Sequence, residues 1–152
     1  MIAIVEDDLS GGQTRALLAF HLEGMHAASP PGSVFALDLV ALRGPDITVW
    51  SAWDGDRIAG IGALKRLAGG GGELKSMRTH PDYVRQGIAR LLLCHIIAQA
   101  RAEGIVRLSL ETGSGTAFAP AIALYRAHGF TTGAAFGGYE ATAFNQFLHR
   151  AL

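Results

Sequence analysis

The sequence has few of the residues that mark several large classes of protein. Cys94 is its only cysteine, which excludes an internal disulfide and a cysteine-rich zinc site. The longest apolar stretch, residues 88–100, is interrupted by Arg90 and His95 and is too short to span a bilayer. The 13 basic and 13 acidic residues balance, so the basic surplus typical of nucleic-acid binding is missing. These features predict no metal site, no membrane and no nucleic-acid partner.

The composition is that of a folded, water-soluble chain. About half of the residues (49%) are hydrophobic and 17% are charged, and 152 residues are enough for a substantial core. The first residues, MIAIVEDDLS, are apolar and then acidic, which is not the pattern of a signal peptide. We therefore expect a single cytoplasmic domain over residues 1–152. Cys94 stands among leucines and isoleucines, and we expect it to be a packed core thiol.

Hydrophobic periodicity and turn residues predict alternating strands and helices. Ser10 begins a capping-box pattern before the first helix, and Asp54-Gly55 separates two β-rich runs as a hairpin turn does. Strands are predicted over residues 1–5, 47–53, 57–67, 73–79 and 105–111, and helices over about 11–27, 34–43, 87–103 and 120–129. The tail, residues 130–152, has the composition of one or two further strands. This order predicts an α/β (α+β) fold with a mixed sheet flanked by helices.

Gly87 stands where a strand-like run gives way to a long apolar helix. A glycine at this place costs roughly 1 kcal/mol of helix stability relative to alanine, which suggests that the backbone must be bare there. The first N–H groups of a helix are unpaired and carry partial positive charge, and a glycine lets a phosphate approach them. Arg85 and Arg90 add formal charge on either side. The pattern predicts a site for a phosphate-bearing ligand, with a purely structural glycine as the alternative.

Two segments together resemble the signatures of the GCN5-related N-acetyltransferase superfamily. Residues 84–89, VRQGIA, resemble its pyrophosphate loop, Q/R-x-x-G-x-G/A, and residues 124–130, LYRAHGF, resemble its second signature, L-Y-x-x-x-G-F. Rival motifs fail: G-x-G-x-x-G is absent, and the P-loop-like run ending in Lys75-Ser76 has Leu74 where glycine is required. The element order also matches, so the resemblance covers nearly the whole chain. It implies a mostly antiparallel central sheet flanked by about four helices.

The resemblance implies an N-acetyltransferase that uses acetyl-CoA and passes the acetyl group directly to an amine in a ternary complex. The pantetheine of the cofactor is expected along the strand at residues 77–79, and its pyrophosphate on the amides of residues 84–89. The implied cofactor-binding residues are Met77, Arg78, Thr79, Val84, Arg85, Gln86, Gly87, Ile88, Ala89, Arg90 and Thr112.

Two positions depart from the family pattern. Val84 stands where glutamine or arginine is usual, which removes a side-chain contact and keeps the backbone amides. Phe118 stands where an asparagine often faces the pantetheine, so we expect Thr112 or Ser114 to make that contact instead.

Acetyl transfer needs a base, because an alkylamine with a pKa of about 10.4 is protonated at pH 7. Glu73 is the candidate: it precedes Gly87 by fourteen residues, a spacing similar to that of the glutamate base in the histone-modifying branch. The alternative for Glu73 is a solvated strand edge. His80 titrates in a suitable range, but His-Pro after a strand is more typical of a structural turn.

Tyr125 is the residue that the resemblance implies as hydrogen-bond donor to the departing thiolate. A phenol with a pKa of about 10 is a weaker acid than a thiol at about 8.5, so stabilisation of the developing charge is favoured over full proton transfer. The alternative is a core tyrosine near the end of a helix. The thioester carbonyl is expected to be polarised by a backbone N–H near Met77.

No motif specifies the acceptor. In the family it depends on the first helices and their loop, here residues 21–33, and on the C-terminal hairpin. We expect residues 29–33 to form one wall of the acceptor site and Trp50 and Trp53 another, unless the tryptophans belong to the core. A small-molecule amine is the leading hypothesis. The alternatives are a protein N-terminus or lysine, and a non-catalytic acyl-CoA-binding module. Members of the family often form homodimers, which implies a contact through the C-terminal strands.

Overall fold

Seven strands form one sheet in the spatial order β1-β2-β3-β4-β5-β7-β6, in a computed structural model that describes residues 1–152. The strands are β1 (Ile2–Glu6), β2 (Ile47–Asp54), β3 (Arg57–Arg66), β4 (Gly71–Thr79), β5 (Arg107–Thr112), β6 (Thr131–Thr132) and β7 (Gln146–Ala151). The helices are α1 (Gly12–Ala28), α2 (Leu39–Leu42), α3 (Ile88–Ala102) and α4 (Ala119–Ala127), with single 3-10 turns at Ala68–Gly70 and Pro81–Tyr83. All neighbouring strands are antiparallel except β4 and β5. The predicted mixed, mostly antiparallel sheet with four helices is confirmed.

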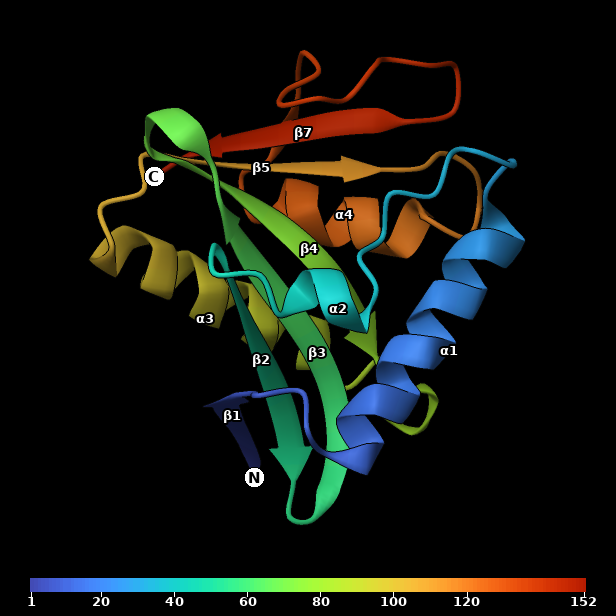
Figure 1. Cartoon of the computed structure of the whole chain (residues 1–152), viewed down its shortest axis with the longest axis vertical. Coiled ribbons are helices and arrows are strands. Elements are labelled where there is room, and N and C mark those ends of the chain that lie inside the picture. Colours follow the sequence, from blue (N-terminus) through green and yellow to red (C-terminus); the bar gives the residue numbers. More distant parts are fainter.

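Helices cover both faces of the sheet, and each face has its own apolar core (Figure 1). Leu17 of α1 and Leu42 of α2 are buried in one core, together with residues of β2 and β3. Leu92 and Ile96 of α3 are fully buried in the other, which also includes Tyr125 of α4. Burying a leucine or isoleucine side chain stabilises the fold by about 1.5–3 kcal/mol. The sheet is therefore packed between helices on both faces. This packing fixes the positions of the strand ends that carry polar groups.

Two glycines of β3 allow α3 to lie close against the sheet. A Cβ on Gly60 would be 2.8 Å from Ile88 Cγ2, and a Cβ on Gly62 would be 2.9 Å from Ile96 Cδ1. These separations are shorter than real Cβ contacts, so larger residues would push the helix away. Because Ile88 is the first residue of α3, this packing fixes the N-terminus of the helix.

The sheet opens between β4 and β5. These strands pair only over residues 71–73 and 107–109, after which β4 pairs with β3 alone and β5 with β7 alone. β4 also contains a bulge: its residues Ser76 and Met77 lie opposite the single residue Gly62 of β3, and Ser76 has a φ of +57°. The separation of the two strands leaves a gap in the sheet that side chains of both strands border.

Two predicted features of the first helices are wrong. The helix expected over residues 34–43 is confined to Leu39–Leu42, because Asp38 caps it by accepting a backbone N–H. Ser10 does not cap α1: Gly11 occupies the N-cap without any side-chain hydrogen bond. The Ser10 hydroxyl bonds instead to a carboxylate of the preceding loop at 2.6 Å, so a local turn competes with the capping box.

The prediction that Cys94 is a core thiol is also wrong. The buried residues of α3 include Leu92, Leu93, Ile96 and Ile97, and Cys94 lies on the opposite, exposed face. A run that is apolar on every side of a helix does not show which face is turned inward. No helix of the structure combines the length and apolarity that crossing a membrane requires.

Candidate active site

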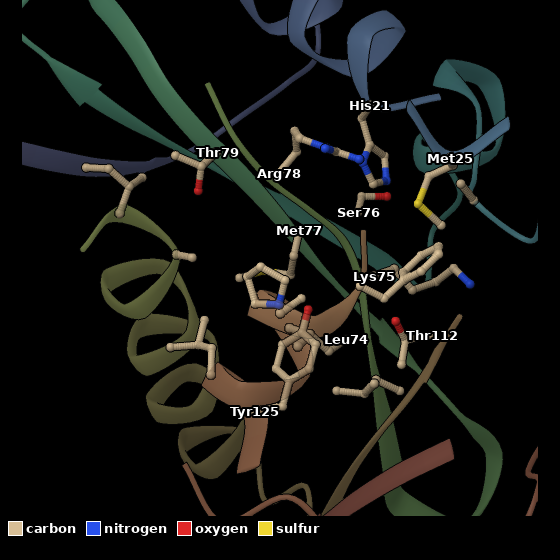
Figure 2. Close-up of a pocket in the computed structure, with 18 of the residues that line it drawn as sticks. His21, Met25, Leu74, Lys75, Ser76, Met77, Arg78, Thr79, Thr112 and Tyr125 are labelled. Atoms are coloured by element: carbon tan, nitrogen blue, oxygen red, sulfur yellow. The ribbon is translucent and has the colours of Figure 1, made fainter. Parts of the chain in front are cut away.

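A cavity of about 600 Å³ lies where β4 and β5 separate (Figure 2). Its walls come from α1, residues 35–36, β4, residues 84–90, β5 and α4. Apolar side chains alternate there with a small number of ionisable ones, which is the usual make-up of a small-molecule site. The cavity therefore gathers segments that are far apart in the sequence.

Backbone N–H groups of residues 84–90 form one end of the cavity. None of them donates to a protein acceptor, and the first helical bond of α3 runs from Leu91 N to Gly87 O at 3.0 Å. Gly87 has a φ of +81° and Arg85 a φ of +62°, which turns the chain sharply into the helix. A Cβ on Gly87 would meet no protein atom within 4 Å, so the space beside this residue is open. This end offers free donors and the positive end of a helix dipole to an anion.

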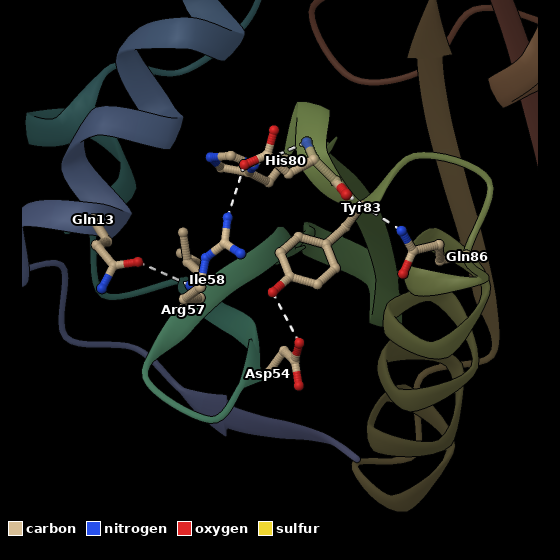
Figure 3. A network of polar contacts seen from close by, with 8 residues as sticks. Gln13, Asp54, Arg57, Ile58, His80, Tyr83 and Gln86 are labelled. Atoms are coloured by element: carbon tan, nitrogen blue, oxygen red, sulfur yellow. Dashed lines mark hydrogen bonds and ion pairs between the residues drawn. The ribbon is translucent and has the colours of Figure 1, made fainter.

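Side chains outside the cavity hold this loop in place (Figure 3). The Tyr83 hydroxyl donates to Asp54 Oδ2 at 2.9 Å, which ties the loop to the β2–β3 hairpin. His80 Nδ1 accepts the Asp82 N–H at 3.1 Å, and Gln86 Nε2 donates to the Asp82 carbonyl at 3.2 Å. His80 thus caps a turn, the structural role that the His-Pro sequence favours. These bonds hold the free N–H groups of residues 84–90, called the cradle below, in place before any ligand binds.

Tyr125, near the end of α4, directs its hydroxyl into the cavity (Figure 2). Its side chain is 7% exposed and packs against Phe130, with ring centroids 5.8 Å apart. Burial raises the pKa of Tyr125 to about 12, although the positive charge of Arg78 opposes the shift. The phenol is therefore protonated at neutral pH and is a donor.

Glu73 is buried at the point where β4 leaves β5, with 3% of its surface exposed. Its Oε2 accepts from Lys75 Nζ at 3.1 Å and from the Tyr139 hydroxyl at 2.6 Å. Lys75 Nζ also donates to the Tyr139 oxygen at 2.7 Å, which closes a triad. Burial and the hydrogen bond to Glu73 raise the pKa of Tyr139 above its ordinary value. Glu73 is not a solvated edge residue, and its charge is balanced within the triad.

Glu111 of β5 is the second carboxyl group in the cavity, and it has no hydrogen bond or ion pair within the protein. The pKa of Glu111 is raised to about 7, mainly by burial; the charge of Lys75 opposes this shift and the charge of Glu73 adds to it. A carboxyl group that titrates near pH 7 is suited to accept a proton at neutral pH. Unlike Glu73, it can do so without breaking an existing contact.

α1 brings His21 against Arg78 of β4. Arg78 Nε donates to His21 Nδ1 at 3.0 Å, and the guanidinium carbon lies 5.6 Å from the centre of the Phe20 ring. Burial, assisted by the charge of Arg78, lowers the pKa of His21 to about 4, so the ring is neutral at pH 7. Figure 2 shows the two side chains pointing toward one another between β4 and α1.

Two loops meet beside the carboxyl groups. Phe35, from the segment between α1 and α2, makes an edge-to-face contact with Tyr139 at 5.3 Å. Tyr139 comes from the loop between β6 and β7 and also packs against Phe136 at 5.2 Å. The contact joins segments about a hundred residues apart in sequence. Phe35 lines the cavity, and Tyr139 supports it from behind through this contact.

A family model establishes what kind of protein has this arrangement. The model of the "Acetyltransferase (GNAT) family" matches residues 15–130. The chain belongs to the GNAT family. The resemblance of its two sequence signatures to this family is thereby confirmed.

Individual GNAT relatives support the same conclusion. The chain is 46% identical over 152 residues to YedL of Escherichia coli (strain K12), covering 100% of this chain and 96% of that protein. It is 48% identical over 146 residues to YsnE of Bacillus subtilis (strain 168), covering 96% and 97%. Both are described as uncharacterized N-acetyltransferases. A solved PaiA N-acetyltransferase from Thermoplasma acidophilum, in complex with coenzyme A, shares the fold: TM-score 0.77, 16% identity, 100% and 99% coverage. The chain is an N-acetyltransferase.

The cavity contains most of the residues that the GNAT signatures predict for the site. All predicted cofactor-binding residues except Gln86 line it, as do both predicted catalytic residues. The side chain of Gln86 bonds back to its own loop. Phe118 and Thr112 line the cavity, whereas Ser114 does not.

The prediction of which residues form the walls of the acceptor site is wrong. Met25 and Phe35 line the cavity near the carboxyl groups, and residues 29–33 do not line it. Trp50 is 4% exposed within the core of the α3 face, and Trp53 packs at the edge of the other core. Both tryptophans follow the core alternative.

Sequence reasoning missed Glu111 and Tyr139. Glu111 alternates with buried leucines in a strand, a pattern that normally indicates a solvent-facing side chain. The separation of β5 from β4 turns this side chain toward the cavity instead. Tyr139 lies in an irregular loop with no local signal, and only its contact with Glu73 reveals its place.

Proposed function

We propose that this GNAT protein transfers the acetyl group of acetyl-CoA directly to the amine of a small molecule while both are bound. One observation carries the proposal: a single cavity has a cradle of free backbone donors at one end and ionisable side chains at the other. Donor and acceptor can therefore meet without an enzyme-bound acetyl intermediate. The only cysteine, Cys94, lies outside the cavity, so no thiol is placed to carry the acetyl group.

The residues present fit the cofactor. We assign the pyrophosphate of acetyl-CoA to the amides of residues 84–90, where Gly87 leaves room for it. Exposed Arg85 and Arg90 lie at the same end of the cavity and add positive charge. The pantetheine is assigned to residues 77–79, with Thr112 on the facing strand. The structurally similar Thermoplasma protein was solved in complex with coenzyme A, which supports coenzyme A as the ligand.

We assign the base to Glu111 and a positioning role to Glu73. Glu73 is the base that the sequence spacing suggested, but its carboxylate already accepts two hydrogen bonds, and protonation would break the triad with Lys75 and Tyr139. Glu111 has no such partner, and its pKa of about 7 lets it take a proton at neutral pH. Glu73 instead keeps Lys75 from pairing with Glu111.

The transfer forms one bond and breaks one. The amine nitrogen bonds to the carbonyl carbon of the thioester, and the carbon–sulfur bond breaks. Glu111 accepts one proton from the incoming ammonium group and releases it to solvent. The second proton leaves the nitrogen after attack and ends on the coenzyme A sulfur. The Met77 N–H, at the bulge that interrupts the β3–β4 pairing, is assigned to polarise the carbonyl oxygen.

Tyr125 stabilises the departing sulfur by donating a hydrogen bond. With a pKa of about 12, its proton would move to a thiolate of pKa about 8.5 only at a cost of about 5 kcal/mol. The hydroxyl is therefore a donor to the developing negative charge and does not protonate the sulfur.

The joined loops at the acceptor end favour a small amine over a protein. The contact between Phe35 and Tyr139 joins the two loops that flank this end. A protein N-terminus or lysine would have to enter as an extended chain past these joined loops. A peptide acceptor is the alternative, and it requires these loops to separate.

Isothermal titration with acetyl-CoA tests the cofactor assignment. We expect micromolar binding by the unmodified protein and none by Gly87→Glu, because the new side chain occupies the phosphate space. Gly104→Glu is a matched control: Gly104 has a φ of +79°, close to the +81° of Gly87, has no neighbour within 4 Å and lies after the other end of the same helix. Equal losses in both variants, or no binding by the unmodified protein, would contradict the proposal.

Turnover then tests the acceptor class. Release of the coenzyme A thiol is followed with a panel of small primary amines and with short peptides that have a free N-terminus or a lysine. We expect turnover with members of the small-amine panel. Turnover with peptides alone would replace the small molecule by a protein acceptor.

A further inference from the structure

Arg78 is a cation inside the cavity that has no acidic partner. It forms no salt bridge, and its one hydrogen bond within the protein is donated to the neutral His21. Burial lowers the pKa of Arg78, and no carboxylate opposes that shift. A guanidinium group remains charged at any physiological pH. No protein carboxylate neutralises its positive charge, which is therefore available to a ligand in the cavity.

The guanidinium is held in one orientation with two nitrogens free. Its Nε bonds to His21 Nδ1, and its face lies over the Phe20 ring, so rotation of the group is restricted. Gly24 lets the guanidinium lie close against α1: a Cβ there would be 3.2 Å from Arg78 Nη2 and 3.7 Å from Nη1. The two free nitrogens form the planar fork that binds a carboxylate through two parallel hydrogen bonds.

A second donor lies in the same wall. Ser76, two residues before Arg78 in β4, lines the cavity, is 8% exposed and has a hydroxyl oxygen without a hydrogen-bond partner. Figure 2 shows Ser76, Arg78 and His21 among the side chains that line the cavity. A buried hydroxyl without a partner is unfavourable. An anion bound at this wall of the cavity would give the hydroxyl the acceptor that the protein does not supply.

Charge is separated across the acceptor end of the cavity. Glu73 and Lys75 neutralise each other, which leaves Glu111 as the acidic group on the β5 side. His21 is neutral, so Arg78 contributes a full positive charge on the α1 side. A ligand with an ammonium group and a carboxylate matches this arrangement, with the ammonium toward Glu111 and the carboxylate toward Arg78.

We propose that Arg78, with the Ser76 hydroxyl, binds the carboxylate of the acceptor, which is therefore a free amino acid or a similar small amino carboxylate. The assignment rests on the proposed acetyltransferase function and specifies its substrate class. His21 and Phe20 act as positioning residues that hold the guanidinium. The acetyl group then reaches the amine while the carboxylate fixes the orientation of the acceptor.

Binding of the product tests this subsite without relying on catalysis. The probes are the N-acetyl derivatives of alanine, leucine, methionine and phenylalanine, each compared with its C-terminal amide by isothermal titration into protein saturated with coenzyme A. We expect at least one acid to bind ten or more times tighter than its amide. In Arg78→Gln and Arg78→Met, each titrated at a coenzyme A concentration that saturates it, the two should bind equally, and unchanged circular dichroism spectra show that both variants are folded.

Two results would overturn the carboxylate site: amides that bind as tightly as acids, or a preference for acids that persists in both Arg78 variants. Failure of every acid to bind at millimolar concentration would also overturn it. The titrations are repeated without coenzyme A, so a protein that does not bind the cofactor, which contradicts the proposed function, still shows whether Arg78 distinguishes an acid from its amide.

Turnover gives an independent readout. Amino acids are compared with their amides as acceptors, and we expect kcat/KM to favour the acids at least tenfold in the unmodified protein and not in Arg78→Gln. The amine of an amino acid amide is the weaker base and is more easily deprotonated, so a preference for the acid does not arise from the reactivity of the amine. Equal or better turnover of the amides by the unmodified protein would contradict the proposal.

Discussion

The two ends of the cavity are built in different ways. At the cofactor end, the donors are backbone N–H groups of one continuous segment, residues 84–90, and side chains such as Gln86 serve mainly to hold that segment. At the acceptor end, the polar groups are side chains from α1, β4 and β5, and Tyr139 of the β6–β7 loop is bonded to them. Glu73, Lys75 and Tyr139 meet there although they are up to 66 residues apart in sequence.

This difference determines how each end responds to substitution. A backbone donor survives a change of its own side chain unless the new side chain fills the site or alters the φ angle. A side-chain network loses function when one member changes, because the others keep their charge or their unmet hydrogen bond. Substitutions at the acceptor end should therefore have larger effects on rate and stability than side-chain truncations at the cofactor end.

The largest effect is expected for Glu111→Gln. Loss of the base should lower kcat by about 10²- to 10⁴-fold, while acetyl-CoA binds as before. In the unmodified protein kcat/KM should rise with pH through about 7, because protonated Glu111 cannot accept a proton below its pKa of about 7. That rise should be missing in the variant. The further rise of kcat/KM at higher pH, where the amine itself loses its proton, should remain. A rise near pH 7 that persists in Glu111→Gln would assign the base elsewhere.

Glu73→Gln should act mainly on stability. It leaves Lys75, whose side chain is 9% exposed, without its carboxylate, and breaking a buried ion pair in this way costs about 3–5 kcal/mol. Urea unfolding measures the loss, and Tyr139→Phe, which removes only a hydroxyl, is the milder comparison at about 1 kcal/mol. The rise of kcat/KM with pH should also move below pH 7. Glu73 raises the pKa of Glu111 and Lys75 lowers it, so losing the charge of Glu73 lowers that pKa. A stable Glu73→Gln protein with no residual activity would instead make Glu73 the base.

The same contrast explains which parts of the site could be predicted from sequence. The cradle depends on a local pattern, a glycine at the start of an apolar helix, and the structure places Gly87 and its neighbours at the cavity as that pattern predicts. The side-chain cluster depends on how strands separate after residue 73 of β4, which no local pattern encodes. Glu111 alternates with leucines like any solvent-facing residue. It lines the cavity because β4 and β5 separate, and the sequence does not show that separation.

The elements of the fold follow the same rule. Strands and long helices were predictable because their periodicity is local, and the mixed sheet with its order of elements is confirmed. Failures occurred where tertiary contacts or competing local bonds decide. Cys94 is exposed because α3 turns a different apolar face inward, and Ser10 bonds to a neighbouring carboxylate in place of capping α1.

Tyr125→Phe tests the point where the two ends meet. Removing the hydroxyl should lower kcat by about 10²-fold, because one donor to the developing charge on sulfur is lost. Affinity for acetyl-CoA should not change, and neither should the pH limb near 7, since the pKa of Tyr125 lies at about 12. The phenyl ring keeps its packing against Phe130, so the measurement reports the hydroxyl alone. Unchanged kcat would mean that the departing thiolate needs no donor from α4.

The smallest effect is expected at the cofactor end, for Val84→Arg. Val84 is 54% exposed and stands where the family pattern has glutamine or arginine, so the new charge should add one solvent-exposed contact to the pyrophosphate. Such a contact contributes about 0.2–1 kcal/mol, or at most about a fivefold lower Kd for acetyl-CoA, and the gain should shrink as salt is added. Val106→Arg, at a 63% exposed position away from the cavity, controls for net charge and should leave Kd unchanged. Because backbone amides remain the main donors, a gain in acetyl-CoA affinity much beyond fivefold would contradict this comparison. It would show that side chains matter as much at the cofactor end as at the acceptor end.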